Sequence, residues 1–355
     1  MIKCVKKIIV LLFVIDIFFL MSCKVAERSK ADYRSAEQKK YQKIFEAFDT
    51  ECVITVYDVN NKSEMIKYVD LIIDRFMEYD EMFSKTNSAS YIYKINNRNS
   101  DYVYVNKDVA DLFDVSKQLY EWSKNLFDVS AGRLYGLWDV KNRKELPESS
   151  DINECLKYVG NYKFSIDDSD TTEDEDEIKM TFYNTTDIQY DFGALVKGYV
   201  CDKIKSMILE DGIIKSAIIN LGGNVCCIGE MRDRKNKSFN IGIYRPFSEN
   251  ELIDKVEVID KCVITSGIYQ RYFKVEGDDN IYHHIINPKT GYPTNNDLDS
   301  VTIISKKGLL GDYLSTSSML LGEQDAKILI SQCREELDDS IMAIFVHSDL
   351  SITKY

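Results

Sequence analysis

Residues 188–228 read IQYDFGALVKGYVCDKIKSMILEDGIIKSAIINLGGNVCCI. Within this segment, Ile188–Tyr190 has the character of a strand, and Ala194–Leu209 has apolar residues at helical spacing. Two runs rich in β-branched residues follow, Ala217–Leu221 and Val225–Ile228, and a pair of glycines separates them. The segment therefore predicts a strand, a helix and two more strands. Elements mixed in this way favour an α+β fold with mixed or antiparallel sheets and packed helices.

The flanking sequence extends the same pattern. Helical spacing of apolar residues predicts helices at Ser63–Phe83 and Val109–Trp122 before the segment, and at Leu310–Leu321 and Glu323–Cys333 after it. Further strands are expected at Val53–Val59, Lys179–Tyr183, Phe239–Tyr244, Val256–Ile259, Val263–Thr265, Tyr272–Val275, Val301–Ile304 and Met342–Val346. Ser165–Glu177 carries a run of acids without the ligand spacing or mid-loop glycine of an EF-hand, so we expect a solvated loop there.

The N-terminus has the features of an export signal. Three lysines within the first seven residues precede Ile8–Met21, an apolar stretch that only Asp16 interrupts. Residues 20–23 (LMSC) then form a lipobox, in which Cys23 is the residue that takes the lipid. The apolar stretch is short for a membrane span of about 20 residues, and a carboxylate near the bilayer centre disfavours one.

This interpretation divides the chain into three parts. Residues 1–22 are the expected lipoprotein signal peptide, residues 23–44 a polar tether, and residues 45–355 one folded domain. The protein would then be exported and anchored by lipid to a bacterial membrane, on its periplasmic or extracellular face. A retained transmembrane anchor is the alternative, and it too places the folded part outside the cytoplasm.

Charge and cysteine content narrow the classes of partner. The formal net charge of −13 argues against a continuous basic surface for nucleic acid, but not against a basic pocket for one phosphorylated ligand. Of nine cysteines, Cys4 and Cys23 lie in the signal, and the others show no CxxC spacing that would imply zinc. We expect buried thiols that act as small apolar side chains. Export would permit one or two disulfides, whose pairing the sequence leaves open.

Two oxygen-bearing side chains lie four residues apart near the C-terminus. If Gly311–Thr316 opens a helix, Asp312 and Thr316 share one helix face. A carboxylate and a hydroxyl are hard oxygen ligands of the type that magnesium prefers. The alternative is an aspartate favoured by the helix dipole beside a surface threonine, and this segment alone favours that alternative.

A possible phosphate site lies at the start of the central helix. In residues 190–199 a strand ends, a glycine turns the chain and a helix begins, so free backbone N–H groups and Lys197 favour phosphate. An ordinary turn capped by Asp191 explains the same residues. Gly222 and Gly223 permit close approach of a ligand, although a tight hairpin also explains them. The pattern is not GxGxxG, so no dinucleotide-binding fold is indicated.

The densest group of polar and aromatic residues is 265–293. It holds two of the three histidines, His283 and His284, together with Arg271 and Lys289. Such a set can stack a planar ring and neutralise phosphate. Adjacent histidines also suggest zinc, but neighbouring strand residues point to opposite faces and no third soft ligand is nearby.

Taken in order, these segments resemble the FAD:protein FMN transferase family of the ApbE type. The matching blocks are 82–84 (MFS), 125–132 (NLFDVSAG) with 137–138 (LW), 191–198 (DFGALVKG), 221–224 (LGGN), 265–267 (TSG) through His284, Pro288 and 290–291 (TG), and 312–316 (DYLST). Their order and spacing carry the resemblance. It implies a T-fold-like α+β architecture and Mg²⁺-dependent transfer of FMN from FAD, the substrate, to a Thr or Ser hydroxyl of a client protein, with release of AMP.

The resemblance also implies roles for individual residues. Magnesium would be bound by the Asp312 carboxylate, the Thr316 hydroxyl and the main-chain carbonyl of Ala194. Asp312 and His284 would be the catalytic residues, with His284 as the base, because an imidazole suits proton transfer near neutral pH. The FAD pocket would be lined by Asn125, Leu126, Phe127, Asp191, Lys197, Gly223, Ser266, Tyr269, Arg271, His284 and Ile286.

Three positions depart from the family pattern. Asn287 stands where an aspartate is usual, Thr86 where a tyrosine is common, and Gln270 where a glutamate is common. These changes leave the implied metal site intact but affect substrate handling. Without an aromatic wall at Thr86, water can compete as the acceptor. A magnesium-dependent FAD pyrophosphatase that yields FMN and AMP is therefore one alternative, and a non-catalytic FAD-binding lipoprotein is another.

Overall fold

The computed structural model describes residues 40–355 apart from 173–176, 184–186, 233, 249 and 338. The expected signal peptide, Cys23 and the tether up to residue 39 lie outside the described residues. The main element is an eight-stranded sheet whose neighbouring strands are antiparallel. In spatial order its strands are β1 (Tyr41–Ala47), β2 (Thr50–Val56), β6 (Ser216–Leu221), β7 (Asn224–Gly229), β10 (Cys262–Gly267), β13 (Leu298–Ser305), β14 (Met342–His347) and β15 (Ile352–Lys354).

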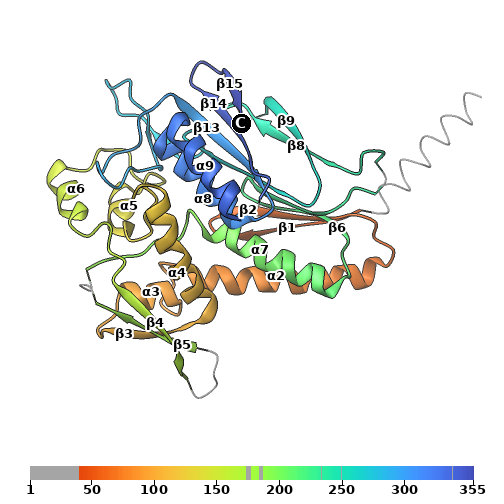
Figure 1. Ribbon diagram of the computed structural model, residues 1–355, viewed down its shortest axis with the longest axis horizontal. Helices are drawn as coiled ribbons and strands as arrows, with labels where there is room; N and C mark the ends of the chain where they lie inside the picture. The colour runs from red at the N-terminus through yellow and green to blue at the C-terminus, as the bar shows by residue number, and fades with distance from the viewer. Residues whose placement is uncertain (1–39, 173–176, 184–186, 233, 249, 338) are drawn as a thin grey trace, which may run out of the picture.

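Four helices cover one face of this sheet (Figure 1). They are α2 (Lys62–Phe83), α7 (Val196–Asp211), α8 (Gly308–Leu321) and α9 (Glu323–Leu337). Helix α8 is almost entirely buried, since it packs against α7, α9 and strands β7, β10 and β13. Two helices that are distant in sequence, α7 and α8, thus meet above the centre of the sheet.

A hairpin covers the opposite face. Strands β8 (Phe239–Tyr244) and β9 (Leu252–Val258) pair with each other, and their apolar side chains pack against Cys227 and Val263 of the main sheet. Because successive strand residues point to opposite faces, the neighbouring Cys226 belongs to the helix-covered side.

A smaller layer lies beside the main sheet, at the lower left in Figure 1. Its sheet has the order β3 (Tyr102–Asn106), β5 (Glu177–Phe182) and β4 (Phe164–Thr171), with helices α3 (Tyr91–Asn96) and α4 (Lys107–Trp122) next to it. Phe113 of α4 is in edge contact with four aromatic rings, those of Phe164, Phe182, Tyr190 and Phe192. Short helices α5 (Gly132–Trp138) and α6 (Ser149–Leu156) and the two-stranded pair β11 (Tyr272–Phe273) and β12 (Tyr282–His283) complete the chain.

The helix ends follow local and long-range capping. The Asn61 side chain accepts hydrogen bonds from the first N–H groups of α2, and Gly212 with φ 64° ends α7 in the left-handed conformation. The N-terminus of α8 is capped from α7 instead. Asp202 accepts from the backbone N–H groups of Gly308 at 2.6 Å and Leu309 at 3.0 Å. These two hydrogen bonds fix the start of α8 against α7.

The predicted α+β class with antiparallel sheets is confirmed, and three local predictions are wrong. The strand predicted at Ile188–Tyr190 is reduced to a single parallel bridge between Gln189 and Ala131. The Asn96 side chain binds the N–H and the carbonyl of Tyr190 at 2.7 and 2.9 Å, so these groups are not available to a neighbouring strand. Residues 165–171 are part of strand β4, with most of their acidic side chains exposed. Residues 41–44, expected in the tether, lie in β1. Among the described residues, no helix is both long and apolar enough to cross a bilayer.

Candidate functional site

Asp312 is a buried carboxylate at the contact between α7 and α8. Its Oδ2 accepts a hydrogen bond from the backbone N–H of Gly198 at 2.6 Å, and its Oδ1 accepts one from Asn224 Nδ2 at 2.6 Å. Burial raises the pKa of Asp312, while the charge of Lys197 and the two hydrogen bonds lower it. Among the described residues it makes no ion pair within 4 Å. A bound cation would stabilise such a carboxylate.

Gly198 allows the close approach of the two helices. A Cβ built on Gly198 would meet the backbone of Gly308 far inside contact distance, and would lie 2.8 Å from Asp312 Oδ2. A Cβ on Gly308 would in turn collide with the backbone of Gly198. The two glycines therefore set the distance at which the Gly198 N–H reaches Asp312.

Thr316 lies one turn beyond Asp312 on α8, as the spacing predicts. Its hydroxyl is 3.1 Å from Ser266 Oγ of β10, which is also 2.8 Å from Ser315 Oγ. Three hydroxyl oxygens thus gather beside the Asp312 helix face. Ser266 was expected to line the FAD pocket, and the structure places it next to the proposed metal ligand.

Ala194 lies in the exposed turn just before α7. The backbone hydrogen bonds found among the described residues include none accepted by the Ala194 carbonyl, and the N–H of Gly198 is directed to Asp312 instead. Asp312, Thr316 and this carbonyl are all hard oxygen donors, so the residues present fit magnesium. No cluster of three His, Cys, Asp or Glu side chains suited to a metal occurs in the described part of the chain.

Lys197 supplies positive charge to the same place. It lies close enough to lower the pKa values of both Asp312 and His284. Its ammonium makes no salt bridge among the described residues. Lys197 therefore has charge available for an anionic ligand at the start of α7.

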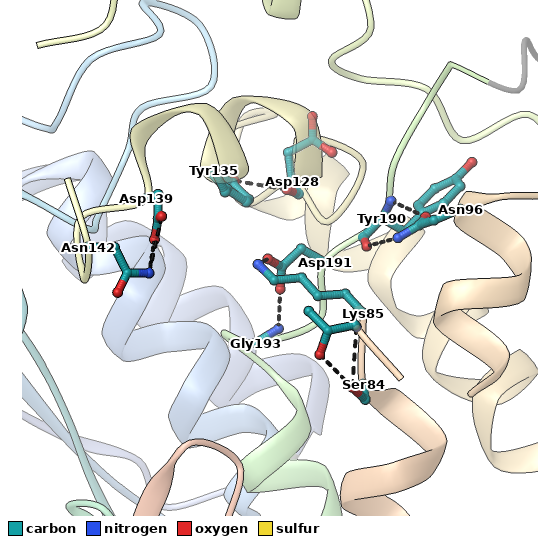
Figure 2. Close-up of polar contacts among 11 residues, drawn as sticks. Ser84, Lys85, Asn96, Asp128, Tyr135, Asp139, Asn142, Tyr190, Asp191 and Gly193 are labelled. Carbon is teal, nitrogen blue, oxygen red and sulfur yellow. Dashed lines mark hydrogen bonds and ion pairs between the residues drawn. The ribbon is translucent and has the colours of Figure 1, made fainter. Parts of the chain in front are cut away.

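Asp191 holds the turn that leads into α7. Its Oδ1 accepts from the N–H of Gly193 at 2.9 Å, and its Oδ2 pairs with Lys85 Nζ at 2.6 Å (Figure 2). The Asp191 N–H donates to the Val129 carbonyl at 2.8 Å. Asp191 therefore joins three loops, those after α2, after α4 and before α7. Asp191 thus closes the turn before α7, while the first N–H groups of α7 itself have no side-chain cap, and ligand binding by Asp191 stays a prediction.

Residues 125–127 form a tight turn after α4. Asn125 has φ 63° and is exposed, while the N–H groups of Leu126 and Phe127 donate to Ser123 Oγ at 3.3 and 2.9 Å. The buried Phe127 ring packs on Tyr313, next to Asp312, with centroids 5.3 Å apart. This packing places the turn beside α8.

The turn at Gly222 and Gly223 positions the side chain of the next residue, Asn224. Gly222 has φ 60° and Gly223 has φ 99°, and the N–H of Gly223 donates to Asn220 Oδ1 at 2.9 Å. A Cβ on Gly223 would meet only Gln270 Nε2, at 3.8 Å. The turn directs the next residue, Asn224, to Asp312. Both sequence alternatives, a tight hairpin and a ligand-facing turn, therefore remain compatible with this geometry.

His284 is held through its backbone and its ring. Its Nδ1 lies 3.2 Å from the Arg271 carbonyl, so Nδ1–H donates there and Nε2 keeps the lone pair that a base needs. The ring retains partial solvent exposure, yet burial is the main cause that lowers the pKa of His284 to about 4. His284 is therefore neutral at physiological pH, as a base must be before it accepts a proton.

Three further residues predicted to line the FAD pocket are Tyr269, Arg271 and Ile286. Tyr269 is half-buried and contacts Phe247 edge-on at 6.1 Å between centroids, and Arg271 is exposed. Ile286 is buried in the small core cluster that includes Trp138. Contact of these three residues with FAD stays a prediction.

Comparison with known proteins gives a consistent result. Residues 48–341 match the model of the ApbE family. The chain belongs to the ApbE family. It is 30% identical over 277 residues to the FAD:protein FMN transferase of Klebsiella pneumoniae strain 342, covering 77% of this chain and 80% of that one. It is 25% identical over 306 residues to the FAD:protein FMN transferase of Treponema pallidum, covering 84% and 83%.

Solved ApbE structures have the same fold. A crystal structure of the ApbE protein of Thermotoga maritima has a TM-score of 0.74 and 26% identity, and the match covers 89% of this chain and 96% of that one. The flavin transferase ApbE of Vibrio cholerae has a TM-score of 0.70 and 20% identity over the same shares. The family and the ApbE-like architecture predicted from the sequence are confirmed.

Two of the positions expected to depart from the family pattern, Asn287 and Thr86, have clear surroundings in the structure. Asn287 Oδ1 accepts from the N–H groups of Lys289 at 2.9 Å and Thr290 at 3.4 Å, which a carboxylate would also do. The substitution therefore keeps the turn. Thr86 is exposed, and its hydroxyl is 3.3 Å from Ser84 Oγ, so no ring stands at this position beside Lys85.

Several residues of this ApbE site were not singled out from the sequence. Asn224 donates to Asp312, Asp202 caps α8, and Lys85 pairs with Asp191. Asn224 ends a quoted motif, so its place after two turn glycines was an available signal. Nothing local marks Asp202 or Lys85, because their partners are 106 residues away in each case.

Two neighbouring histidines, His283 and His284, are expected to make the stability of this ApbE protein depend on pH. His283 Nε2–H donates to the Thr294 carbonyl at 2.9 Å, and its Nδ1 accepts from the N–H of Ile285 at 3.2 Å. Burial lowers the pKa values of His283 and His284 to about 4 from the ordinary 6.5. The unfolded chain therefore binds protons first as pH falls. We expect the free energy of unfolding to decrease between pH 6.5 and pH 4 on this account.

Urea unfolding at pH 7 and pH 5 checks this expectation. The variant His283→Gln keeps a donor for the Thr294 carbonyl but cannot titrate, so its loss of stability on acidification should be smaller than that of the natural chain. Protonation of carboxylates lowers the stability of both proteins equally. The difference between their two losses of stability therefore reports on His283. Equal losses in the two proteins would contradict the assignment.

Proposed function

We propose that this protein transfers FMN from FAD to a Thr or Ser hydroxyl of a client protein, with release of AMP. The observation that carries the proposal is the buried Asp312 carboxylate, which the Gly198 N–H holds at the start of α7 beside the Thr316 hydroxyl. Relatives that cover most of the chain are named FAD:protein FMN transferase.

The chain offers positions for each part of this reaction. Asp312, Thr316 and the Ala194 carbonyl would hold Mg²⁺, which neutralises charge on the FAD pyrophosphate when bound. Lys197 and the N-terminus of α7 would orient the phosphates, since both favour anions. The client hydroxyl oxygen attacks the FMN-side phosphorus, and the bond from that phosphorus to the AMP phosphate breaks. His284 Nε2 accepts the proton that the hydroxyl loses.

The export prediction forms part of the proposal. Residues 1–22 would direct the chain out of the cytoplasm, and lipid on Cys23 would hold it at a bacterial membrane, on the periplasmic or extracellular face. Its clients would then be exported or membrane proteins with an exposed Thr or Ser. The support for this part is the lipobox and the polar residues after it.

A second candidate is FAD pyrophosphatase activity at the same site. The exposed Thr86 favours it, because no aromatic side chain at this position shields the neighbourhood of Asp191 from water. Water would then take the place of the client hydroxyl, and FMN and AMP would be released. Binding of FAD without turnover is the third possible outcome.

A single assay separates these functions. The detergent-purified full chain is incubated with FAD, MgCl₂ and a domain with one exposed threonine, and with the same domain in which valine replaces that threonine. Covalent flavin fluorescence on the threonine domain alone establishes the transferase. Free FMN and AMP without labelled protein indicate the pyrophosphatase. Unchanged FAD in every reaction leaves only a binding protein.

Thr316 provides a specific test of the metal ligands. Thr316→Val keeps the shape of the side chain but removes its oxygen, so we expect transfer to slow by about 100-fold, the loss typical of one removed catalytic contact. The Mg²⁺ concentration needed for half-maximal rate should also rise. Thr316→Ser retains the hydroxyl and should stay close to the natural rate. Equal activity of the valine and serine variants would rule Thr316 out as a ligand.

A further inference from the structure

Three buried thiols meet where α7 packs on the main sheet. Cys226 of β7 and Cys262 of β10 have their Sγ atoms 3.1 Å apart, and Cys201 of α7 is hydrogen-bonded to Cys226. Each of the three side chains is at most 1% exposed. Among the described cysteines, only these three have another thiol as a hydrogen-bond partner.

The backbone register suits a covalent link between Cys226 and Cys262. The two residues are directly opposite in the β7–β10 pairing. The N–H of Cys227 donates to the Lys261 carbonyl at 2.9 Å, which identifies Cys226 and Cys262 as a pair that is not itself hydrogen-bonded. Such pairs have Cα atoms about 4.5 Å apart, within the range of about 4.4 to 6.8 Å that disulfides span.

The surroundings favour reaction at Cys226. Hydrogen bonds from Cys201 and Cys262 lower the pKa of Cys226, and the nearby charge of Lys205 acts in the same direction. The Lys205 ammonium is fixed there by the Asp260 carbonyl at 2.9 Å. These contacts form as α7 and the two strands come together, so Cys226 is the thiol that ionises most readily in the last stage of folding, when it can still reach an external disulfide.

The thiols also lie between the parts of the candidate site. Cys226 follows Asn224, the donor to Asp312, by two residues, and Cys262 precedes Ser266, the neighbour of Thr316, by four residues on the next strand. A link between these cysteines would hold together the two strands that contact the proposed metal ligands.

We propose that Cys226 and Cys262 form a cross-strand disulfide when the chain folds in the presence of a low-molecular-weight disulfide. The Cys226 thiolate attacks one sulfur of that oxidant, and a mixed disulfide forms as one external thiolate leaves. Cys262, after losing its proton, attacks Sγ of Cys226 and expels the second external thiolate. The protein thiols lose two electrons in total, the external disulfide gains them, and the two protons end on the released thiols. Because the sulfurs are buried, the bond forms during folding.

The experiment is oxidative refolding followed by mass mapping. The full chain is unfolded, reduced and refolded in detergent with oxidised and reduced glutathione, then alkylated in denaturant. We expect two fewer alkylated cysteines than in the reduced control, and a tryptic peptide that joins the segment after Lys261 to the one that contains Cys226. Fragment ions distinguish Cys226 from Cys227. This result is independent of flavin transfer, so failure of the proposed function would leave it unaffected.

Two variants make the test specific. Cys262→Ala should remove the linked peptide. Cys333 is a buried cysteine of α9 that does not contact another described thiol, so Cys333→Ala should retain the linked peptide. If Cys262→Ala does not fold, the map of the natural chain still decides. Full alkylation of the seven cysteines from Cys52 to Cys333 after oxidative refolding would overturn the proposal. A Cys201–Cys226 link would equally overturn this pairing.

Discussion

Replacing Asp312 with alanine is expected to lower the rate of flavin transfer by about a thousand-fold, the upper end of what one lost electrostatic contact costs. The carboxylate is the only charged ligand among the three proposed for Mg²⁺. Its removal also leaves the Gly198 N–H and the Asn224 amide without their acceptor. The transfer assay described above, at saturating FAD and MgCl₂, measures the effect.

Asp202→Asn is the matched control for this variant. Asp202 is a partly buried carboxylate that also orders α8, but it binds the first N–H groups of the helix and none of the proposed metal ligands. Burial raises its pKa to about 6. We expect Asp202→Asn to lower the urea midpoint while transfer stays within about three-fold of the natural rate. If both variants lose activity alike, α8 placement explains the loss, and Asp312 has no separate catalytic role.

Gly198→Ala is expected to have the second large effect. The added methyl group would overlap the Gly308 backbone, and neither helix can yield without moving Asp312. We expect a loss of at least about 3 kcal/mol in the free energy of unfolding, since overpacking against backbone exceeds the usual cost of an enlarged core side chain. Transfer should fall with it, because the Gly198 N–H no longer reaches Asp312 Oδ2.

Gly136→Ala controls for the substitution itself. Gly136 is helical, in α5, and a Cβ built there meets nothing within 4 Å. Alanine at this position should leave stability unchanged or raise it by up to about 1 kcal/mol, because alanine favours helices over glycine. Urea unfolding of the two variants side by side gives the comparison. Equal midpoints would contradict the tight α7–α8 contact.

Much of the fold could be predicted because each element has its own pattern. Strand β8 has the bounds that its alternation predicts, and α8 differs from its prediction by two residues at the start. The errors lie where distant side chains decide. Asn96 occupies the backbone groups that would have made Tyr190 part of a strand, and no local signal reveals a partner 94 residues away.

The placement of two proposed metal ligands on one helix was also predictable, while their binding of Mg²⁺ stays a prediction. The four-residue spacing of Asp312 and Thr316 on one helix is a local property, and it correctly placed both on α8. Spacing alone could not distinguish a metal site from a helix-dipole effect, and the proposal of a metal site rests on the resemblance. The groups that position Asp312 come from α7 and β7, 114 and 88 residues earlier, so they emerged only from the three-dimensional arrangement.

The long separation between Asp312 and its partners has a consequence for biosynthesis. A ribosome has already made the glycine hairpin and α7 well before it adds α8, yet the partial chain lacks both proposed side-chain ligands. On the proposed function, FAD and Mg²⁺ would find their complete set of contacts only on finished chains, and would then stabilise those chains by mass action. A truncated product that ends before α8 would bind FAD and Mg²⁺ less tightly, so these ligands would stabilise it less than they stabilise the finished chain.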